Sequence, residues 1–375
     1  MIELKSLCKS FDGVPAVRDL DVVVGRGEFL CLLGSSGCGK STTLRMIAGF
    51  VRPDSGTVLI DGVDVSGFGP DARPTSMVFQ DYAIFPHLTV AENIEFGLKA
   101  QKLARDERAR RTEEALELVG LTGLGGRRPN ELSGGQQQRV AVARSLAIRP
   151  SVLLMDEPLS NLDAKTRIQL RTQLREIQRD TGTTIVYVTH DQEEALALGD
   201  RIAVMRDGSL EQLGSAHEIY LAPSSGYVAD FVGITNWLVG EFAGESAGSW
   251  EVDVAGAALP ATPAGASSSV APGSLVDVSV RPEDVSLTEE DATDGRALRG
   301  VVRDVQFLGP VVRTYVDVDG SVVIVHSAQS DWSPGAAVRL AVGNGAARAF
   351  ARTEGAWRPP AAAARPGSAV ATAAS

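Results

Sequence analysis

The segment that most constrains the fold is GSSGCGKST, from Gly34 to Thr42. It follows GEFLCLLG, an apolar run typical of a buried strand, and it precedes STTLRMIAGF, which has the spacing of an amphipathic helix. The pattern G-x-x-x-x-G-K-[ST] between a strand and a helix is typical of a loop that binds phosphate through backbone N–H groups and the helix N-terminus. The sequence therefore predicts an α/β domain with a phosphate cradle made of Gly34, Ser35, Ser36, Gly37, Cys38, Gly39, Lys40, Ser41 and Thr42.

Side chains suited to nucleoside triphosphate hydrolysis occur in this loop and in a later strand. Lys40 can reach the β- and γ-phosphates, and the Ser41 hydroxyl is a hard oxygen ligand suited to Mg²⁺. Asp156 and Glu157 end the apolar run SVLLMDEP, and an α/β sheet presents its ligand crevice at such strand ends. We therefore expect Asp156 to bind Mg²⁺, directly or through water. We expect Glu157 to orient and deprotonate the attacking water. The competing interpretation is a solvated acidic turn.

A second anion-binding helix start is indicated before GQQQRVAVARSLAI, a helical pattern that Pro150 ends. Its backbone amides and a serine hydroxyl suit the positive end of a helix. One nucleotide needs one cradle, yet this chain carries two such helix starts. Taken alone, the second is also compatible with an ordinary helix N-cap after a loop. The residues concerned are Ser133, Gly134, Gly135 and Gln136.

Three motifs in this order resemble those of the nucleotide-binding subunits of ABC transporters. LSGGQQQR is similar to the ABC signature motif, and it lies between GSSGCGKST and LLMDEP as in that family. The resemblance implies a P-loop NTPase fold of the ABC type with ATP and Mg²⁺ as ligands. It also implies a head-to-tail homodimer, in which Ser133 and its glycines cap the γ-phosphate held by Lys40 of the other protomer.

Further positions take their expected roles from the same resemblance. Gln80 matches the glutamine that senses Mg²⁺ and the attacking water, and His190 matches the switch histidine that contacts the γ-phosphate. Asp163 ends SNLD, which is similar to the loop that crosses the dimer interface. Phe11 stands where the family places an aromatic ring against adenine; the alternative is a core phenylalanine. No catalytic position departs from the family pattern.

The segment after Gln80 is the expected contact with membrane subunits. In the family, apolar residues here line the groove that accepts a coupling helix of the permease. Tyr82, Ile84 and Phe85 would have that role in this chain, and core packing is the alternative.

The pattern of apolar residues predicts two domains. Residues 1–235 alternate strand and helix patterns, and residues of about 82–150 form a helical subdomain that carries the signature. Residues 236–350 show short alternating runs and an Asp319-Gly320 pair, which is a strong hairpin signal. This pattern predicts a small all-β domain, which we expect to be a barrel. Residues 351–375 have too little apolar bulk to fold and are expected to be disordered.

The C-terminal domain favours an importer. VRPEDV (residues 280–285) and FLGP (residues 307–310) resemble the accessory OB-like (TOBE-like) barrel of importer ATPases. This domain either binds a regulatory ligand or only stabilises the dimer. A nucleotide kinase has no use for LSGGQ. An exporter is usually fused to a membrane domain.

Composition excludes other partners. The net charge of −11 argues against a nucleic-acid binder and against anchoring to anionic lipids by charge alone. No secretory signal or apolar run of about 18 residues is visible, and the three cysteines show no metal-type spacing. We therefore expect a peripheral protein on the cytoplasmic face of the plasma membrane. The resemblance implies that two transmembrane permease subunits hold it there, and that an extracytoplasmic solute-binding protein serves the permease.

The predicted function is ATP hydrolysis that drives solute import in a bacterium. QDYAIFPHLTVAENIEFGL and DEPLSNLDAKTR are most similar to the ferric-iron and polyamine branch. A maltose-type sugar, phosphonate or sulfate importer is the alternative. A non-transport ABC ATPase of chromosome condensation or DNA repair is a further alternative, but it would normally need a long coiled coil or DNA-binding segments.

Overall fold

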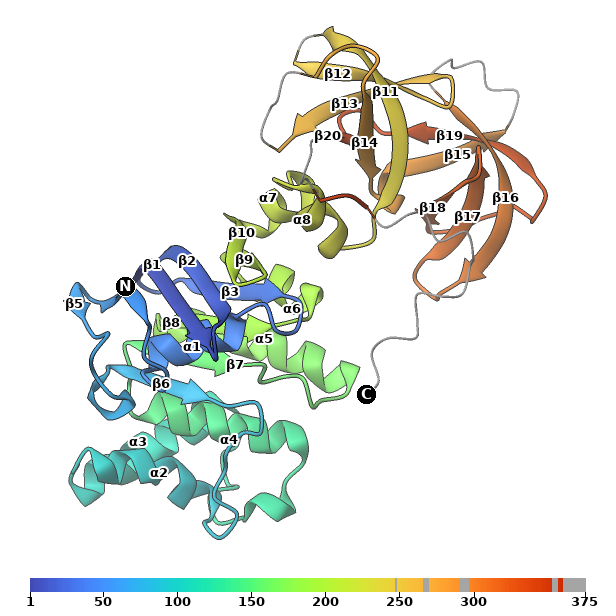
Figure 1. The fold of residues 1–375 in the computed structure, drawn as a ribbon. Coiled ribbons are helices and arrows are strands. Elements are labelled where there is room, and N and C mark those ends of the chain that lie inside the picture. Colours follow the sequence, from blue (N-terminus) through green and yellow to red (C-terminus); the bar gives the residue numbers. More distant parts are fainter. Residues whose placement is uncertain (247, 266–269, 290–296, 353–356, 360–375) are drawn as a thin grey trace. The chain divides into compact units, whose positions relative to one another are not determined.

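A computed structural model describes residues 1–246, 248–265, 270–289, 297–352 and 357–359. The chain divides into two compact units, residues 1–216 and residues 217–375 (Figure 1). Each has a hydrophobic core of its own. In the described part, no helix is both long and apolar enough to cross a bilayer.

The first unit is built on two sheets. The larger has the order β10-β9-β3-β8-β7-β6 and is parallel except for β10. Its strands are β3 (Phe29–Gly34), β6 (Thr75–Val78), β7 (Val152–Asp156), β8 (Thr184–Thr189), β9 (Arg201–Arg206) and β10 (Ser209–Gly214). The antiparallel second sheet contains β1 (Ile2–Phe11), β2 (Val14–Val24), β4 (Ser55–Ile60) and β5 (Val63–Asp64).

The central parallel strands explain why the functional loops meet. Every residue of β3, β7 and β8 is buried, as expected for strands covered on both faces. Because β8 lies between β3 and β7, the loops after these three strands emerge side by side at one edge of the sheet. The predicted buried strands around GEFLCLLG and SVLLMDEP are therefore confirmed.

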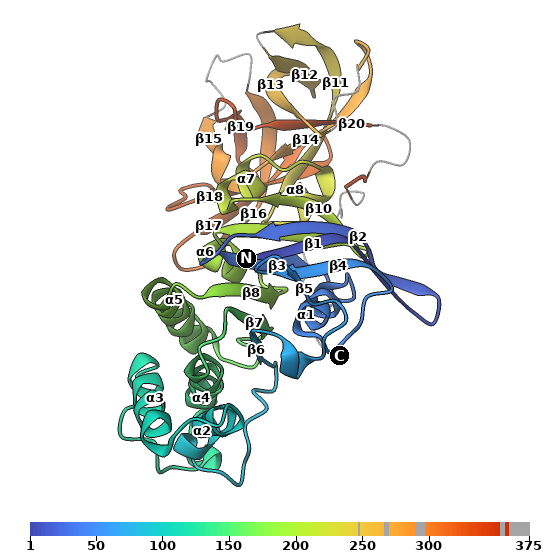
Figure 2. The same cartoon turned by 90° about the vertical axis from the view of Figure 1, so that its left-hand side faces the viewer.

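Helices complete the first unit. Three of them, which follow β6 and precede β7 in the sequence, pack against one another (Figure 2). These three are α2 (Val90–Ala100), α3 (Arg105–Leu118) and α4 (Gly134–Ala147). The others are α1 (Lys40–Ala48), α5 (Ala164–Thr181), α6 (Gln192–Leu198) and the short turns η1 (Pro70–Ala72) and η2 (Pro129–Glu131). Thr89 begins α2 with a capping box, which fixes where that helix starts.

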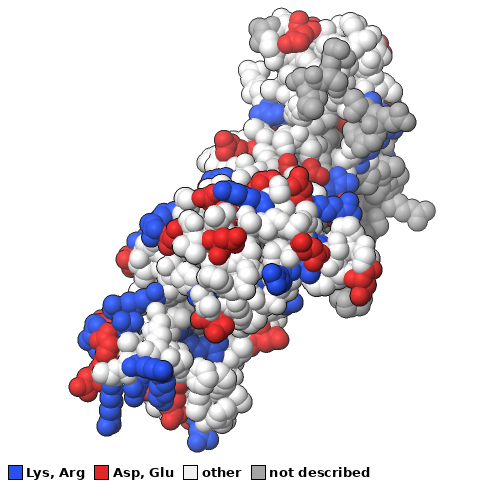
Figure 3. Space-filling view, turned by 60° about the vertical axis from the view of Figure 1, so that its left-hand side comes forward, with Lys and Arg blue, Asp and Glu red and all other residues white. Residues whose placement is uncertain are grey.

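Charged side chains cover the end of the first unit where α2 and α3 lie, with Lys and Arg prominent and Asp and Glu among them (Figure 3). On α3, Arg110 pairs with Glu107 and Glu114, and Arg111 pairs with Glu107. Pairs three and four residues apart stabilise an exposed helix by a few tenths of a kcal/mol each. Part of the positive charge at this end is therefore neutralised within α3 itself.

The second unit is mainly β-structure, as predicted. A closed barrel contains β11 (Asn236–Ser246), β12 (Ser249–Val254), β13 (Ala257–Ala264), β14 (Leu275–Val280) and β20 (Arg348–Ala351). A five-stranded sheet, which the sequence did not separate from the barrel, contains β15 (Val285–Glu289), β16 (Leu298–Phe307), β17 (Val312–Val318), β18 (Ser321–Ser327) and β19 (Ala337–Val342). The remaining elements are α7 (Ala216–Leu221), α8 (Gly226–Phe231) and η3 (Pro282–Asp284). The predicted hairpin is confirmed, because Asp319 and Gly320 have φ of 49° and 80° and join paired strands.

The boundary between the units differs from the prediction at residue 235. The units divide after Ala216, because Arg281 of the β-unit donates hydrogen bonds to the carbonyls of Tyr220, Ala229 and Ile234. Its guanidinium also lies over the Tyr220 ring, 4.2 Å from the centroid. This arginine belongs to VRPEDV, so one role of that motif is to hold the segment with α7 and α8 against the β-strands.

The predicted disordered tail, residues 351–375, lies mostly outside the described residues. The described part of it contacts the second unit. Ala351 ends β20, and Arg352 pairs with Asp277. The Trp357 ring lies 5.4 Å from the ring of Trp237. Folded structure therefore extends past the predicted end of the β-domain.

Candidate active site

The loop between β3 and α1 is shaped by its glycines. Gly37 and Gly39 have φ of 82° and 100°, a region that favours glycine. A Cβ atom on Gly39 would lie 2.3 Å from the carbonyl oxygen of Ala16, so no other residue fits there. Lys40 is 4% exposed, and its ammonium donates to the carbonyls of Gly34 and Ser35, both at 2.8 Å. The lysine is thus held inside the loop, while residues 35–37 are exposed at its tip.

Two oxygen-bearing side chains that could bind a metal, Ser41 and Asp156, meet where α1 begins and β7 ends. The Ser41 hydroxyl donates to Oδ1 of Asp156 at 2.8 Å, and Asp156 is 6% exposed. Nη2 of Arg45 lies 3.7 Å from Oδ2 of the same carboxylate. No cluster of three His, Cys, Asp or Glu that could hold a metal occurs among the described residues. One hydroxyl and one carboxylate match the donor set of Mg²⁺, which usually keeps water and substrate phosphates as its other ligands.

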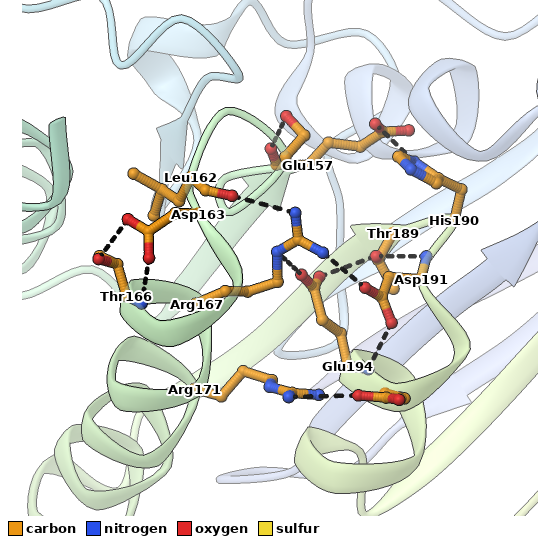
Figure 4. A network of polar contacts seen from close by, with 12 residues as sticks. Glu157, Leu162, Asp163, Thr166, Arg167, Arg171, Thr189, His190, Asp191 and Glu194 are labelled. Atoms are coloured by element: carbon orange, nitrogen blue, oxygen red, sulfur yellow. Dashed lines mark hydrogen bonds and ion pairs between the residues drawn. The ribbon is translucent and has the colours of Figure 1, made fainter. Parts of the chain in front are cut away.

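Glu157 follows directly after β7 in a strained conformation. Its φ is 45°, a costly region for a residue with a side chain, and its N–H donates to the carbonyl of Val188 at 3.0 Å. Oε2 of Glu157 lies 2.9 Å from Nδ1 of His190, which follows β8 (Figure 4). The structure therefore joins the two residues that the sequence assigned to water activation and to the γ-phosphate.

The loops after β6 and β7 also meet. Nε2 of Gln80 donates to the Ser160 hydroxyl at 3.5 Å, and Nδ2 of Asn161 donates to the Gln80 carbonyl at 3.4 Å. Ser160 in turn donates to the carbonyl of Glu157 at 2.9 Å. Ser160 therefore links the side chain of Gln80 to the backbone of Glu157, although Gln80 and Glu157 are distant in the sequence.

The residues of the second helix start, Ser133 to Gln136, form a capping box of their own. The Ser133 hydroxyl accepts from the N–H of Gln136, and the Gln136 side chain accepts from the N–H of Ser133. A Cβ on Gly135 would lie 2.8 Å from Cγ2 of Thr166 in α5. No hydrogen bond between described residues joins this capping box to the Lys40 loop of the same chain.

Burial decides between the alternatives for the remaining predicted residues. Phe11 is 47% exposed, so it is not a core phenylalanine. Tyr82 is 8% exposed, so the core-packing alternative is right for Tyr82, and its expected place in the groove is wrong. Ile84 and Phe85 are half-buried. Asp163 caps α5, and hydrogen bonds from Thr166 hold the pKa of its carboxyl below the usual value.

Sequence reasoning missed a buried carboxylate behind His190. Glu194 is 3% exposed and accepts hydrogen bonds from the hydroxyls of Tyr187 and Thr189, both at 2.8 Å. Burial raises the pKa of Glu194, and these hydrogen bonds oppose the rise. An acidic residue at the start of an otherwise apolar helix face in HDQEEALAL was the available signal.

Arg167 of α5, which the sequence analysis also missed, links three segments around the site (Figure 4). Nη1 donates to Asp191 at 3.0 Å, and Nη2 donates to the carbonyl of Leu162 at 3.1 Å. Nε lies 3.7 Å from Oε1 of Glu194. The loop that carries Asp163 is thereby tied to the loop that carries His190.

Comparisons with known proteins agree with this geometry. The family model described as ABC transporter matches residues 17–160, and the model described as TOBE domain matches residues 278–350. The fold classes predicted for the two parts of the chain are thus confirmed. The bacterial ABC transporter cassette MJ0796, solved as a dimer, is 34% identical, with a TM-score of 0.52. The match covers 58% of this chain and 99% of the cassette.

Import proteins are similar over most of the chain. The spermidine/putrescine import ATP-binding protein PotA of Acidothermus cellulolyticus is 48% identical over 342 residues, 88% of this chain and 87% of the relative. The Fe(3+) ions import ATP-binding protein FbpC of Rhizobium etli is 44% identical over 347 residues, 92% of this chain and 96% of the relative. The chain therefore belongs to the ABC transporter family, as an ATP-binding ATPase subunit with a C-terminal TOBE domain.

Proposed function

We propose that this chain hydrolyses ATP at the interface of a head-to-tail homodimer and thereby drives the import of ferric iron or a polyamine. The observation that carries the catalytic part is the contact between Glu157 and His190 beside the Ser41–Asp156 pair. Asp156 and Glu157 stand at the end of β7, His190 follows β8, and Ser41 lies in the first turn of α1. They therefore converge where the triphosphate chain must lie.

The cradle residues, Gly34 to Thr42, hold the β- and γ-phosphates. Backbone N–H groups of the exposed tip donate to the phosphate oxygens, and the N-terminus of α1 adds partial positive charge. Lys40 supplies a full positive charge next to the γ-phosphate. The exposed Phe11 ring stacks on the adenine base.

Mg²⁺ is the metal that the donors fit. Ser41 and Asp156 would hold it, with Gln80 as a further ligand from the loop after β6. When bound, Mg²⁺ neutralises charge on the phosphate oxygens. The 2.8 Å hydrogen bond between Ser41 and Asp156 supports this, because it brings two hard oxygen atoms to one point.

Glu157 acts as the general base. Its carboxylate accepts a proton from the attacking water, and the strained backbone at this residue directs the side chain toward the site. His190 lies within hydrogen-bond distance of that carboxylate and contacts the γ-phosphate. Its second ring nitrogen remains for the phosphate oxygen.

The dimer supplies the rest of the site. Ser133, Gly134, Gly135 and Gln136 cap the γ-phosphate bound to the other protomer, and Asp163 lies in the loop that crosses the interface. No hydrogen bond between described residues joins this helix start to the Lys40 loop of its own chain, which is compatible with a site shared between two chains. The MJ0796 cassette, to which this chain is similar, was solved as a dimer, which supports a dimeric assembly.

Transport requires membrane partners. Two transmembrane permease subunits would hold the dimer at the cytoplasmic face of the plasma membrane, and a solute-binding protein outside would deliver the cargo. Half-buried Ile84 and Phe85, close to Gln80 in sequence, suit contact with a permease helix. Two relatives are a spermidine/putrescine import protein and an Fe(3+) ions import protein, which supports the choice of cargo.

Uptake of labelled ferric iron and labelled putrescine tests the proposal in cells with and without this chain. Complementation with Lys40→Ala separates ATP-driven import from mere presence of the protein. Loss of one uptake that the wild-type chain restores and Lys40→Ala does not restore identifies the cargo. If neither uptake changes, the proposed cargo is wrong.

A further inference from the structure

The turn that follows Gln80 is strained at two consecutive residues. Tyr82 and Ala83 have φ of 58° and 45°, which side-chain-bearing residues rarely adopt. Such a conformation persists only where the surroundings hold it, and it is typical of functional loops. The contacts of this turn therefore determine where Gln80 lies.

Arg144, in the last turn of α4, holds both strained residues. Its Nη1 donates to the carbonyl of Ala83 at 2.7 Å, and its Nη2 donates to the carbonyl of Tyr82 at 3.0 Å. The guanidinium also lies over the Phe85 ring, 5.6 Å from the centroid. Burial lowers the pKa of Arg144, and no carboxylate in the described part of the chain is ion-paired with it. The planar fork of this arginine is thus used on the backbone of the turn.

Other contacts fix the two sides of the turn to different parts of the first unit. On one side, Gln80 is bonded to Ser160 and Asn161 in the loop after β7. On the other side, Asn93 of α2 is fully buried and bonds both the N–H and the carbonyl of Phe85, at 2.9 and 3.1 Å. The strained turn is therefore the junction between the catalytic loops and the helices α2 and α4.

We propose that Arg144 is a positioning residue that sets the place of Gln80 according to the position of α4. The same helix begins with Ser133 and ends near Arg144, about 16 Å away at 1.5 Å per residue. A rigid helix moves as one body, so a displacement of its N-terminus by a nucleotide on the partner chain displaces the Arg144 guanidinium as well. The two carbonyls follow, and Gln80 follows them. This inference rests on the proposed roles of Gln80 and of the helix start.

The test is steady-state ATP hydrolysis by the full-length chain as a function of ATP and of free Mg²⁺. For Arg144→Gln we expect kcat to fall about 10-fold to 100-fold, because a misplacement on the order of 1 Å has an effect of that size. The Mg²⁺ concentration at half-maximal rate should rise, and the KM for ATP should stay within about 2-fold, because the Lys40 loop is untouched. Arg144→Lys should be intermediate, since an ammonium cannot bond both carbonyls with a planar fork.

Ala83→Gly separates positioning from general stability. Glycine adopts the left-handed conformation without strain, and the exposed Ala83 side chain makes no core contact that would be lost. The double variant Arg144→Gln/Ala83→Gly should therefore recover most of the lost kcat and Mg²⁺ affinity. Arg110→Gln removes an arginine on the surface of α3 and is the matched control. It should alter neither kcat nor the Mg²⁺ concentration at half-maximal rate.

The outcomes are distinct. Unchanged kcat and Mg²⁺ dependence in Arg144→Gln, or no recovery in the double variant, would overturn the role of Arg144. If Arg144→Gln does not fold, Arg144→Lys with and without Ala83→Gly gives the same comparison. Gln80→Ala is measured in parallel: if it too has no effect, the proposed role of Gln80 fails. If Gln80→Ala lowers the rate and Arg144→Gln does not, only this inference fails.

Discussion

Arg167→Gln tests whether the contacts between α5 and the two loops stabilise the fold. The variant keeps most of the aliphatic stem and removes the positive charge between Glu194, Asp191 and the Leu162 carbonyl. Hydrogen bonds to charged groups contribute about 1.5–3 kcal/mol when protected from water. The Arg167 and Asp191 side chains are 28% and 25% exposed, which weakens their pair. We therefore expect a loss of about 2–3 kcal/mol at pH 8.

The loss should depend on pH because of Glu194. Burial raises the pKa of this carboxyl above 4.5, and Arg167 is one of the groups that oppose the rise. A raised carboxyl pKa means that stability falls as pH increases from the unfolded-state pKa through the folded-state pKa. Without Arg167 the folded-state pKa is higher still, so the fall continues over a wider pH range. The loss should be about 1 kcal/mol smaller at pH 5 than at pH 8.

Urea unfolding of both proteins at pH 5 and pH 8 measures this difference. Arg171→Gln is the matched control, one helical turn further along α5, because its partner Glu193 is 84% exposed. That control should lose under about 0.5 kcal/mol at either pH. Equal losses for Arg167→Gln at the two pH values, or a loss no larger than that of the control, would refute the reasoning.

Three further variants test other parts of the chain. Glu157→Gln should lower ATP hydrolysis about 10²-fold to 10⁴-fold and leave an ATP-bound dimer that persists in size-exclusion chromatography, whereas an undiminished rate would exclude Glu157 as the base. Phe11→Ala should raise the KM for ATP by up to about 10-fold without changing the thermal midpoint, and an equal rise in the exposed neighbour Val14→Ala would argue against stacking. Arg281→Ala should destabilise the second unit by about 3 kcal/mol in calorimetry because it leaves buried carbonyls unpaired, and a loss no greater than that of exposed Arg299→Ala would contradict this.

The parts of the fold that follow local rules could be predicted from the sequence. GSSGCGKST needs its glycines because backbone passes within contact distance, as at Gly39, and such a requirement is visible in the residue types alone. SVLLMDEP carries a run of apolar side chains that only a strand covered on both faces can bury. The Asp319–Gly320 turn likewise follows from conformational preferences of two adjacent residues.

The remaining features depend on contacts between distant residues. Arg167 and Asp191 are 24 residues apart, and nothing near either one indicates the other. The boundary after Ala216 depends on Arg281, which bonds carbonyls far earlier in the chain. The neighbours of Tyr82, Asp81 and Ala83, suggest a surface position for it. In the structure its backbone is left-handed and its ring is buried. Pattern reasoning has no term for such tertiary contacts.

One chain of polar contacts crosses the ends of three neighbouring strands, β6, β7 and β8. Gln80 after β6 donates to Ser160, Ser160 donates to the carbonyl of Glu157, and the Glu157 carboxylate lies 2.9 Å from His190 after β8. The first of these contacts is long at 3.5 Å, and the other two are both 2.9 Å. A shift of the loop after β6 would therefore break or shorten the Gln80 contact first, while Glu157 and His190 stay paired. The proposed regulation through the position of Gln80 would thus change hydrolysis while the contact between Glu157, the proposed base, and His190 stays intact.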